Sequence, residues 1–470
     1  MTLLVFLATI PVLKPGLPLL FADDSTIESK SAVSRVYHVA KCDREPVVRA
    51  DRPWEGRCAG VYGSVNRQGD GWRMWYNNSG DRTFVADSTD GKVWTKPAIN
   101  VYGSMYKDNN IVCDRFGSPS VLLDPFEKNP SRRYKMVGVR YVKSGSKIDE
   151  KETGYYTSTS PDGIHWNESV KVLDSCDTVT MAQNPQTGRF FIYHKICASV
   201  ADASNPAQRR LVYVSCSDDF RTWSKPELAL APDDADDAAW IDGPHQRTDI
   251  YNMAVIAHAG GFIGFPTMFR VLGHRPYPEK NPKKEVDDGP IDVQLATSAD
   301  GMSWRRTPGR RVVIPLGAAG DFDGGMIPGV SSGSPVTIGD ETALYYYGVS
   351  HSHGVGRDDT VFAVGRAVWR RWGFVSLEAM KDGKFVTRPV VLKTSDVRVN
   401  VEMLKVRKNP FVRIVALSED DRTLAVSEPI TESGTQVAIR WKDGKSPSFG
   451  VPVKFKISLN SAAVYALEVF

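Results

Sequence analysis

The chain has 470 residues, of which 59 are Lys or Arg and 55 are Asp or Glu, so its net charge is +4. This length corresponds to about two to four domains, or to one large β domain with an appendix. The hydrophobic share of 41% excludes a disordered chain, and 29 prolines with 39 glycines exclude a long helical bundle. Because the charge is close to neutral, we expect no nucleic-acid partner.

The first 22 residues are predicted to form a signal peptide. The run Thr2–Leu13 is almost wholly apolar, and a second run, Leu17–Ala22, ends before Asp23. An apolar core followed by a small residue is typical of secretory signals. A basic first region is missing and Lys14 interrupts the run, which leaves a wrongly chosen start codon or a buried strand as the alternative. Later apolar runs are far shorter than the roughly 20 residues of a spanning helix, so we expect a secreted or periplasmic protein without a membrane span.

The cysteines and histidines do not form a metal-binding pattern. No two cysteines are spaced as Cys-x-x-Cys, so we expect no zinc ribbon. We also assign no metal ligand among the site residues and expect no cofactor, while a structural ion in the channel stays an open question. His351 and His353 would face the same way in an extended strand, but no third ligand lies near them in sequence, and contact with a sugar or a carboxylate is favoured. Disulfide pairing in an exported chain stays open. The cysteines are Cys42, Cys58, Cys113, Cys176, Cys197 and Cys216.

A seven-residue phrase that begins with Ser and ends with Trp recurs along the chain. Its four clear copies are Ser88–Trp94, Ser160–Trp166, Ser217–Trp223 and Ser298–Trp304, and a degenerate fifth is Trp369–Phe374. Three copies contain Asp-Gly, which predicts a tight turn, and the Trp is expected to pack an outer strand onto the next unit. The Asp residues of the phrase are therefore predicted to be turn residues without a catalytic role.

Strand-like runs rich in Val, Ile, Tyr, Phe and Thr precede each phrase. Three such runs and the Trp strand give four strands per unit, and five units fill residues 35–385. Repeats of this length that are built from short strands are typical of propellers. The sequence therefore predicts an all-β protein with a five-bladed β-propeller, whose ligands we expect at the mouth of a narrow channel.

Residues 389–470 are predicted to form a small antiparallel β-sandwich. The Trp phrase stops before this region, and segments such as Val399–Glu402, Val412–Ala416 and Val453–Ile457 tend to alternate apolar and polar residues. Turns such as Lys442–Lys445 separate them. Short alternating strands at this spacing are typical of a sandwich.

Several motifs give the chain a resemblance to a known family. They are Pro53–Glu55, Arg73–Tyr76, Asp108–Val112, Arg133–Met136, Ser160–Trp166, Asp249–Asn252, Gly264–Pro266, Asp321–Met326, Gly373–Leu377 and Val451–Phe470. In these motifs the chain resembles the five-bladed propeller glycoside hydrolases of the invertase/levanase and arabinanase/xylosidase type, above all bacterial proteins similar to the N-terminal domain of invertases. The resemblance implies a carbohydrate substrate and cleavage of glycosidic bonds. The Asn-Asp-Pro-Asn-like run of invertases is absent, so β-fructosidase activity is not implied.

The resemblance also implies that catalytic carboxyl groups come from the inner strands of separate blades. The matching residues are Glu55, Asp177, Asp249 and Asp323. Glycoside cleavage needs one carboxyl group as acid and a second as base or nucleophile, and convergence on one channel mouth would bring such a pair into range. The alternative is that each carboxylate caps a strand or binds neighbouring backbone amides.

Loops that enter the innermost strands, or that join the second and third strands, supply the predicted substrate contacts. These are Trp54, Asn109, Asn110, His194, Asp242, Tyr251, Arg270, His351 and His353. Lys195 lies in one of the same loops. Arg209 and Arg210 are interpreted as solvated surface charge.

Three functional hypotheses follow, led by an exported glycoside hydrolase that acts on a polysaccharide or oligosaccharide. A non-catalytic carbohydrate-binding propeller would present aromatic residues at the mouth without two carboxyl groups in range. A glycan phosphorylase of the same fold would need a cluster of cations, which His194, Lys195, Arg270 and His351 could supply. The sequence leaves the sugar, the stereochemical outcome and the oligomeric state open.

Overall fold

The computed structural model describes residues 10–78, 80, 82–144, 147–149, 151–174, 177–196, 209–238, 240, 246–277, 281–355, 357–406 and 408–470. Regular structure in these residues is nearly all β-strand, which confirms the all-β prediction, and the one α-helix in these ranges is the short α1 (Asp234–Asp237). The 3-10 helices are η1 (Asp24–Thr26), η2 (Pro53–Glu55), η3 (Pro130–Arg132), η4 (Pro308–Arg310) and η5 (Lys442–Gly444). No helix in the described part is long and apolar enough to cross a membrane.

Twelve of the fourteen strands between residues 64 and 230 form three antiparallel units of four strands each, in chain order. Unit 1 contains β7 (Ser64–Gln68), β8 (Gly71–Asn77), β9 (Thr83–Ser88) and β10 (Ile111–Cys113). Unit 2 contains β11 (Gly117–Leu123), β12 (Tyr134–Arg140), β15 (Gly154–Ser160) and β16 (Val170–Leu173). Unit 3 contains β17 (Val179–Gln183), β18 (Phe190–His194), β19 (Val212–Ser217) and β20 (Glu227–Leu230). Strands β12 and β18 are almost wholly buried on both faces, as expected where units pack face to face.

Two further units complete this part of the molecule. Unit 4 contains β21 (Arg247–His258), β22 (Gly261–Val271), β25 (Ile291–Val293), β26 (Ala296–Ser298) and β27 (Arg305–Arg306). Unit 5 contains β28 (Met326–Val330), β30 (Val336–Ile338), β31 (Glu341–Val349) and β32 (Phe362–Arg370). Its outer strands come from the N-terminal part of the chain, because β5 (Lys41–Cys42) and β6 (Val48–Arg49) pair with β32. The expectation that a Trp strand closes every unit is therefore wrong for unit 5.

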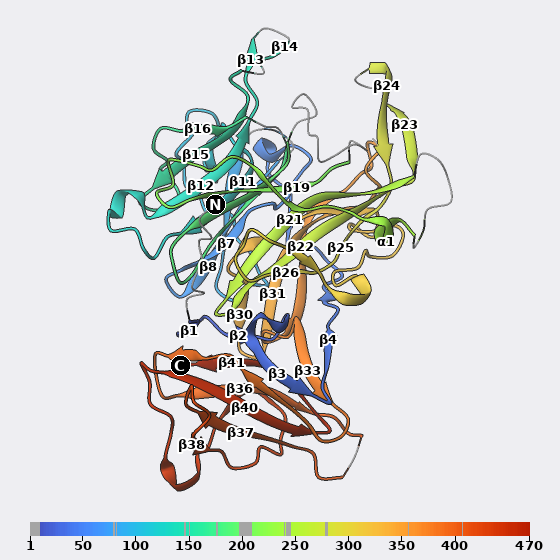
Figure 1. Cartoon of the computed structure of the whole chain (residues 1–470). Coiled ribbons are helices and arrows are strands. Elements are labelled where there is room, and N and C mark those ends of the chain that lie inside the picture. The colour runs from blue at the N-terminus through green and yellow to red at the C-terminus, as the bar shows by residue number, and fades with distance from the viewer. Residues whose placement is uncertain are drawn as a thin grey trace, which may run out of the picture.

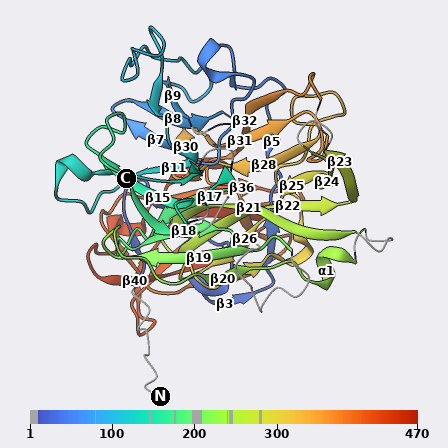
Figure 2. The same cartoon turned by 90° about the horizontal axis from the view of Figure 1, so that it is seen from above.

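The units surround a common centre when seen from above, with β11, β17 and β21 nearer to it than β9 or β20 (Figure 2). The short strand β29 (Ser332–Gly333) pairs with both β7 and β21. Two hairpins project from the end opposite the C-terminal strands (Figure 1). They are β13 (Lys143–Ser144) with β14 (Lys147–Ile148), and β23 (Gly273–Tyr277) with β24 (Asn281–Asp288).

The repeated phrase forms a turn that is stabilised by its own Asp and Ser. Asp162 Oδ1 accepts hydrogen bonds of 2.9 and 2.8 Å from the backbone N–H groups two and three residues further on, and Ser160 Oγ accepts one of 2.9 Å from Gly163. Gly163 has a φ of 74°, and a Cβ at this position would lie 2.6 Å from the Trp75 ring. Both facts require glycine here.

The same turns join neighbouring units. The Gly163 carbonyl of unit 2 accepts a hydrogen bond of 2.8 Å from Trp75 Nε1 of unit 1, and the Gly301 carbonyl of unit 4 accepts one of 2.9 Å from Tyr193 of unit 3. The Gly91 carbonyl of unit 1 accepts one of 2.5 Å from Tyr345 of unit 5. Units 1 and 5, which are distant in sequence, are thus in contact through the same kind of bond as sequence neighbours.

The C-terminal part of the chain forms two more sheets, which lie below the five units in Figure 1. One contains β1 (Val12–Leu13), β3 (Ile27–Ser31), β34 (Gly383–Thr387), β35 (Val390–Leu392), β37 (Phe411–Leu417), β38 (Thr423–Val426) and β40 (Pro452–Asn460). The other contains β2 (Leu19–Leu20), β4 (Ser34–Tyr37), β33 (Val375–Ala379), β36 (Val397–Met403), β39 (Gly434–Ala438) and β41 (Ala462–Val469). Apolar side chains of both sheets share one buried cluster, with Phe385 and Ile457 from the first and Val399 and Leu467 from the second.

The predicted boundaries at 35–385 and 389–470 differ from those of the structure. Strand β33 pairs with β41 and strand β34 pairs with β40, so the C-terminal sheets begin directly after Gly373. The degenerate Trp phrase lies at this junction. Arg371 pairs with Glu468 at 2.8 Å, and Trp372 Nε1 donates a hydrogen bond of 2.9 Å to the same carboxylate. These contacts fix unit 5 to the C-terminal sheets.

Residues 10–22, which fall within the predicted signal peptide, are built into the C-terminal sheets. Strand β1 pairs with β35 in parallel, and strand β2 pairs with β41. Leu13, Leu19, Leu20 and Phe21 are completely buried. This agrees with the buried-strand alternative for this segment, because removal of residues 1–22 would take two strands and four apolar side chains out of the fold.

Candidate functional site

The candidate site lies where the innermost strands begin and the second strands end. The side chains that meet there come from all five units, and we call them the mouth cluster. Its members are Tyr62, Tyr141, Asp177, Lys195, Arg210, Arg247, Asp249, Tyr251, Asp287, Tyr347 and His353. Contacts described below connect each of them to at least one other member. The cluster contains aromatic rings, three cations and three carboxylates.

Asp177 and Lys195 form the ion pair of this cluster that reaches the surface. Lys195 Nζ lies 2.5 Å from Asp177 Oδ2 and 3.8 Å from the ring centre of Tyr251. Lys195 is only 8% exposed, whereas the Asp177 side chain is 38% exposed. Burial lowers the pKa of Lys195, and the charge of Asp177 opposes this effect. The pair therefore offers an accessible carboxylate whose cation is buried beneath it.

The backbone at Asp177 is strained. Its φ is 89°, in a region that residues with a Cβ rarely adopt. The Asp177 N–H donates a hydrogen bond of 3.0 Å to the Tyr141 hydroxyl of unit 2. Strain that the surrounding structure maintains is more frequent at functional sites than elsewhere, and it directs this carboxylate towards the mouth cluster.

A second group of charges lies beside this pair, and in it two arginines offset the charges of two carboxylates. Arg210 contacts Asp249 at 2.9 Å and Asp287 at 2.7 Å, and Arg247 contacts the same two carboxylates at 3.0 and 2.8 Å. Asp249 is completely buried. Burial favours the neutral form of Asp287, but hydrogen bonds and charges from Arg210 and Arg247 outweigh this and lower its pKa. Two arginines thus compensate two carboxylates at the start of β21.

Aromatic side chains fill the space between the charged groups. The His353 ring lies 5.4 Å from that of Tyr251 and 4.8 Å from that of Phe269, and its Nδ1 is 2.8 Å from the Asp287 carbonyl. Burial lowers the pKa of His353, which favours the neutral ring. The Tyr62 ring meets that of Tyr347 edge-on at 5.6 Å. Flat rings with polar atoms at their edges suit the binding of a sugar.

A buried thiol lies behind these rings. The Cys58 Sγ is 3.0 Å from the Tyr347 hydroxyl, and Cys58 is 2% exposed. Burial raises its pKa to about 11, so it is not a reactive thiolate at neutral pH. Of the cysteines in the described ranges, Cys42, Cys58, Cys113 and Cys216 are free thiols. Cys176 and Cys197 lie outside those ranges.

Glu55 lies outside the mouth cluster, in a closed network between units 1 and 5. Its Oε2 accepts hydrogen bonds from the backbone N–H groups of Asp51 and Arg52 at 3.0 and 2.9 Å and from Lys96 at 2.7 Å. The Tyr76 hydroxyl donates to Oε1. Glu55 is completely buried and binds neighbouring backbone amides, which is the arrangement described by the alternative for this residue.

The same network contains other predicted substrate contacts. Trp54 Nε1 donates a hydrogen bond of 2.8 Å to Asn110 Oδ1, and Asn110 Nδ2 donates one of 2.8 Å to the Tyr76 hydroxyl. Asn109 Nδ2 donates one of 2.6 Å to the Tyr106 carbonyl, and its Oδ1 accepts one of 2.9 Å from the N–H of Ile111 at the start of β10. Asn109 and Asn110 are buried and bonded to protein groups, so the structure does not bring them to the mouth cluster.

The remaining predicted residues have separate surroundings. Asp323 accepts a hydrogen bond of 2.6 Å from Tyr346, and burial raises its pKa. Its apolar neighbours belong to the cluster shared by units 4 and 5. His194 is buried in β18 with Nε2 at 3.1 Å from Ser215 Oγ, and burial lowers its pKa to about 4. In the described residues, the side chains of Asp323 and His194 bond to Tyr346 and Ser215 and to no side chain of the mouth cluster.

Arg270 and His351 lie near the cluster without joining it. Arg270 pairs with Asp292 across β22 and β25, and His351 Nδ1 is 3.0 Å from Ser350 Oγ. Asp242 lies outside the described residues. Of the predicted residues, the structure thus brings together Asp177, Asp249, Tyr251 and His353.

Sequence reasoning missed part of the cluster. Arg210 was interpreted as surface charge and this is wrong, since it contacts Asp249 and Asp287. Arg247 and Asp287 were not singled out. Tyr62 and Tyr141 could have been found by the rule that residues entering an innermost strand or leaving a second strand reach the mouth. The pairing of Arg210 with a carboxylate 77 residues away has no local signal.

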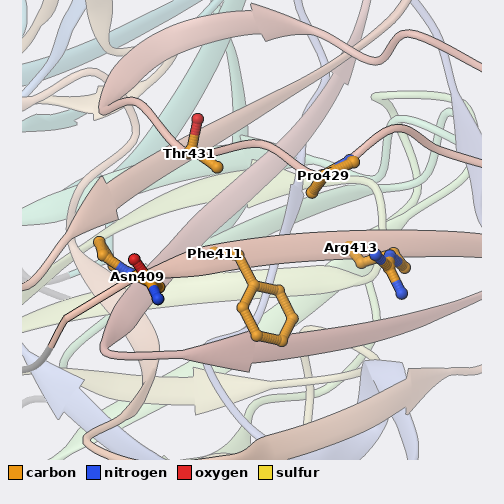
Figure 3. A pocket seen from close by; sticks show the side chains of 6 residues that line it. Asn409, Phe411, Arg413, Pro429 and Thr431 are labelled. Atoms are coloured by element: carbon orange, nitrogen blue, oxygen red, sulfur yellow. The ribbon is translucent and has the colours of Figure 1, made fainter.

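We also searched the described residues for a metal site and for a second pocket with catalytic groups. In the described residues, no group of three His, Cys, Asp or Glu side chains is placed to hold a metal ion. A hollow of about 410 Å³ opens on the outer face of the C-terminal sheets, and Figure 3 shows the side chains that line it. The lining consists of Asn409, Pro410, Phe411, Arg413, Pro429 and Thr431. It contains no carboxyl group, so it lacks the acid and base that glycoside cleavage requires.

Comparisons with known proteins give only distant likenesses. No protein-family model matches the chain, and no curated protein matches it. Solved structures similar to it include an N-acetylgalactosamine deacetylase from F. plautii in complex with blood group B trisaccharide, with 15% identity, a TM-score of 0.46, and coverage of 72% of this chain and 96% of that one.

Two further solved structures are glycoside hydrolases. A glycosyl hydrolase from Bacteroides ovatus has 13% identity and a TM-score of 0.41, with coverage of 71% of this chain and 94% of that one. The alpha-L-arabinofuranosidase of Podospora anserina, in complex with cellotriose, has 10% identity and a TM-score of 0.42, with coverage of 71% and 98%. Because all three TM-scores lie below 0.5, these likenesses do not assign an activity.

Proposed function

We propose that units 1–5 are the blades of a five-bladed β-propeller and that the C-terminal sheets form a β-sandwich. The antiparallel pairing within each unit, and the hydrogen bond between Gly91 of unit 1 and Tyr345 of unit 5, support a closed ring. The buried cluster shared by the two C-terminal sheets supports a sandwich. In this arrangement the mouth cluster lies at one end of the central channel.

We propose that the protein is a glycoside hydrolase that acts at this mouth. One observation carries the proposal: side chains from every unit converge on an accessible carboxylate, Asp177, among tyrosine rings. Asp177 would act as base or nucleophile. Asp249 is the second carboxyl group of the cluster, and one of its contacts with Arg210 and Arg247 would have to loosen before it could hold a proton for the leaving group.

A non-catalytic carbohydrate-binding protein is the second candidate, because a specific observation favours it. Of the three carboxylates in the cluster, only Asp177 is accessible, since Asp249 is buried and Asp287 is bound to two arginines. A binding site needs aromatic rings and hydrogen-bond donors but no free acid. The cations Lys195 and Arg210 would also be available to a phosphorylase, although both already contact carboxylates.

A glycan screen tests the proposal. The wild-type protein and the Asp177→Asn variant are incubated with a panel of plant, algal and microbial polysaccharides and oligosaccharides, and reducing ends and bound glycan are measured separately. A glycosidase releases reducing ends with wild type and loses this release with Asp177→Asn. Binding without release would establish the binding protein instead, and release that requires inorganic phosphate would establish the phosphorylase.

Export stays a prediction, but the fold bears on where a mature chain can begin. Residues 10–22 supply two paired strands and four buried apolar side chains. Loss of such a buried side chain costs about 2–5 kcal/mol of stability. A variant without residues 1–22 is therefore expected to melt at clearly lower temperature than the full chain, or to fail to fold. Equal melting temperatures would show that the segment is dispensable and that cleavage near Asp23 is compatible with the fold.

A further inference from the structure

Lys195 has a position that neither packing nor solubility explains. The Lys195 side chain is 10% exposed. Its ammonium group contacts one oxygen of Asp177 and lies 3.8 Å from the ring centre of Tyr251. Placing a cation below the surface costs free energy unless its partners compensate it. Here the carboxylate and the face of the aromatic ring both do so. The second oxygen of Asp177, Oδ1, makes no hydrogen bond within the described residues.

A third side chain, that of Tyr155, joins the backbone of Lys195 to that of Thr178, the residue after Asp177. The Tyr155 hydroxyl of unit 2 accepts a hydrogen bond of 3.3 Å from the Lys195 N–H and donates one of 3.2 Å to the Thr178 carbonyl. Tyr155 is completely buried. Lys195, which follows the end of β18, and Thr178, which precedes the start of β17, are thus fixed to each other by a buried ring.

We propose, resting on the proposed glycosidase, that Lys195 is a positioning residue for Asp177. Its ammonium group holds Oδ2 so that Oδ1 faces the mouth, where the sugar and the attacking water would bind. The strained backbone of Asp177 directs its side chain, and the ion pair with Lys195 fixes the rotation of the carboxylate. Lys195 touches no reacting atom in this role. A reacting group displaced by 1 Å can lose about 10²-fold in rate.

The role requires Lys195 to carry its proton. The groups that face it in the described ranges include Asp177, Arg210, Asp249, Tyr251, His353 and the hydroxyl of Tyr155. Burial lowers its pKa and Arg210 contributes in the same direction, while Asp177 and Asp249 raise it. The net direction is downward, so Lys195 loses its proton at lower pH than an ordinary lysine. Activity should therefore fall on the alkaline side as pH rises through this lowered pKa.

Two substitutions test the proposal. Lys195→Met removes the charge but keeps most of the apolar stem, and we expect kcat to fall about 10²-fold with little change in KM. Lys195→Arg keeps a charge that stays protonated to pH 12 or above. We expect it to keep substantial activity and to move the alkaline limb of the pH profile upward by at least about one unit. The matched control is Lys92→Met, which removes an exposed lysine paired with Glu341 and should change neither kcat nor the profile.

The outcomes separate the inference from the proposed function. If wild type cleaves glycans and Lys195→Met keeps its kcat, or Lys195→Arg leaves the alkaline limb in place, the positioning role is wrong while the glycosidase stands. If Lys195→Met does not fold, the pH profile of Lys195→Arg decides alone. If wild type cleaves no glycan, the proposed function fails and the positioning role fails with it.

Discussion

Glu55 and Asp177 occupy equivalent places in the sequence pattern and opposite places in the molecule. Each precedes the first strand of its unit, and each was expected to be catalytic. Glu55 is completely buried, and both of its oxygens accept hydrogen bonds from Asp51, Arg52, Tyr76 and Lys96. Asp177 is partly exposed, has a strained backbone and keeps one oxygen without a hydrogen bond in the described part of the chain.

From this difference we infer that a carboxylate at the right strand end is not sufficient for a site. A buried carboxylate whose oxygens all accept hydrogen bonds from protein groups holds a loop in place. It has no oxygen left to contact a substrate. A carboxylate that is held on one side only, at the edge of a cluster of rings, can still meet a substrate. The two residues therefore form a natural pair for separating catalysis from stability.

The largest effect is expected from Asp177→Asn. The amide keeps the volume of the side chain but cannot act as base or nucleophile, so turnover should fall about 10²–10⁴-fold. Asn also tolerates the left-handed backbone region, so the melting temperature should change little. The measurement is kcat on a glycan that wild type cleaves, with thermal melts of both proteins. A variant that keeps more than about a tenth of the wild-type rate would contradict the assignment.

The opposite result is expected from Glu55→Gln. In the described part of the chain, the substitution leaves Lys96, whose side chain is 9% exposed, with the more exposed Asp51 as its one carboxylate partner. Removing one member of a buried ion pair costs about 3 kcal/mol or more. The free energy of unfolding should fall by an amount of this order in denaturant titrations, while kcat of the folded protein stays near wild type. If the variant is as stable as wild type but has a much lower kcat, Glu55 is a catalytic residue and the prediction is wrong.

The fold could be predicted largely from the sequence because its repeats are local. The phrase Ser160–Trp166 contains its own turn hydrogen bonds, so seven residues suffice to define it. The strand pairings at the two ends of the repeating region could not be predicted in this way. Strands β5 and β6 pair with β32 across more than 300 residues, and Val12–Leu13 pairs with Val391–Leu392. Such pairings depend on long-range packing and have no local pattern.

The site could be predicted only in part for the same reason. Asp177, Tyr251 and His353 follow from the rule about strand ends. Arg210 pairs with Asp249 and Asp287, which are 39 and 77 residues away, and a lone arginine in a loop looks like surface charge. The sequence also cannot separate Glu55 from Asp177, because the hydrogen bonds that occupy Glu55 come from Tyr76 and Lys96 of other segments.

The smallest effect is expected from Asp162→Asn, which tests a carboxylate that was never expected in the site. Asp162 is partly exposed; burial opposes its ionisation, but hydrogen bonds from His165, Ile164 and Ser160 outweigh it and lower its pKa to about 2. Its folded pKa lies below its unfolded value, so the carboxylate contributes stability above about pH 4 that is lost as pH falls through 2. Because solvent screens an exposed group, the free energy of unfolding of the variant should be lower than that of wild type by no more than about 1 kcal/mol at pH 7 and by less at pH 2. Its kcat should be unchanged. Melts at both pH values measure this difference, and a loss of turnover with Asp162→Asn would mean that the turn positions residues of the mouth cluster.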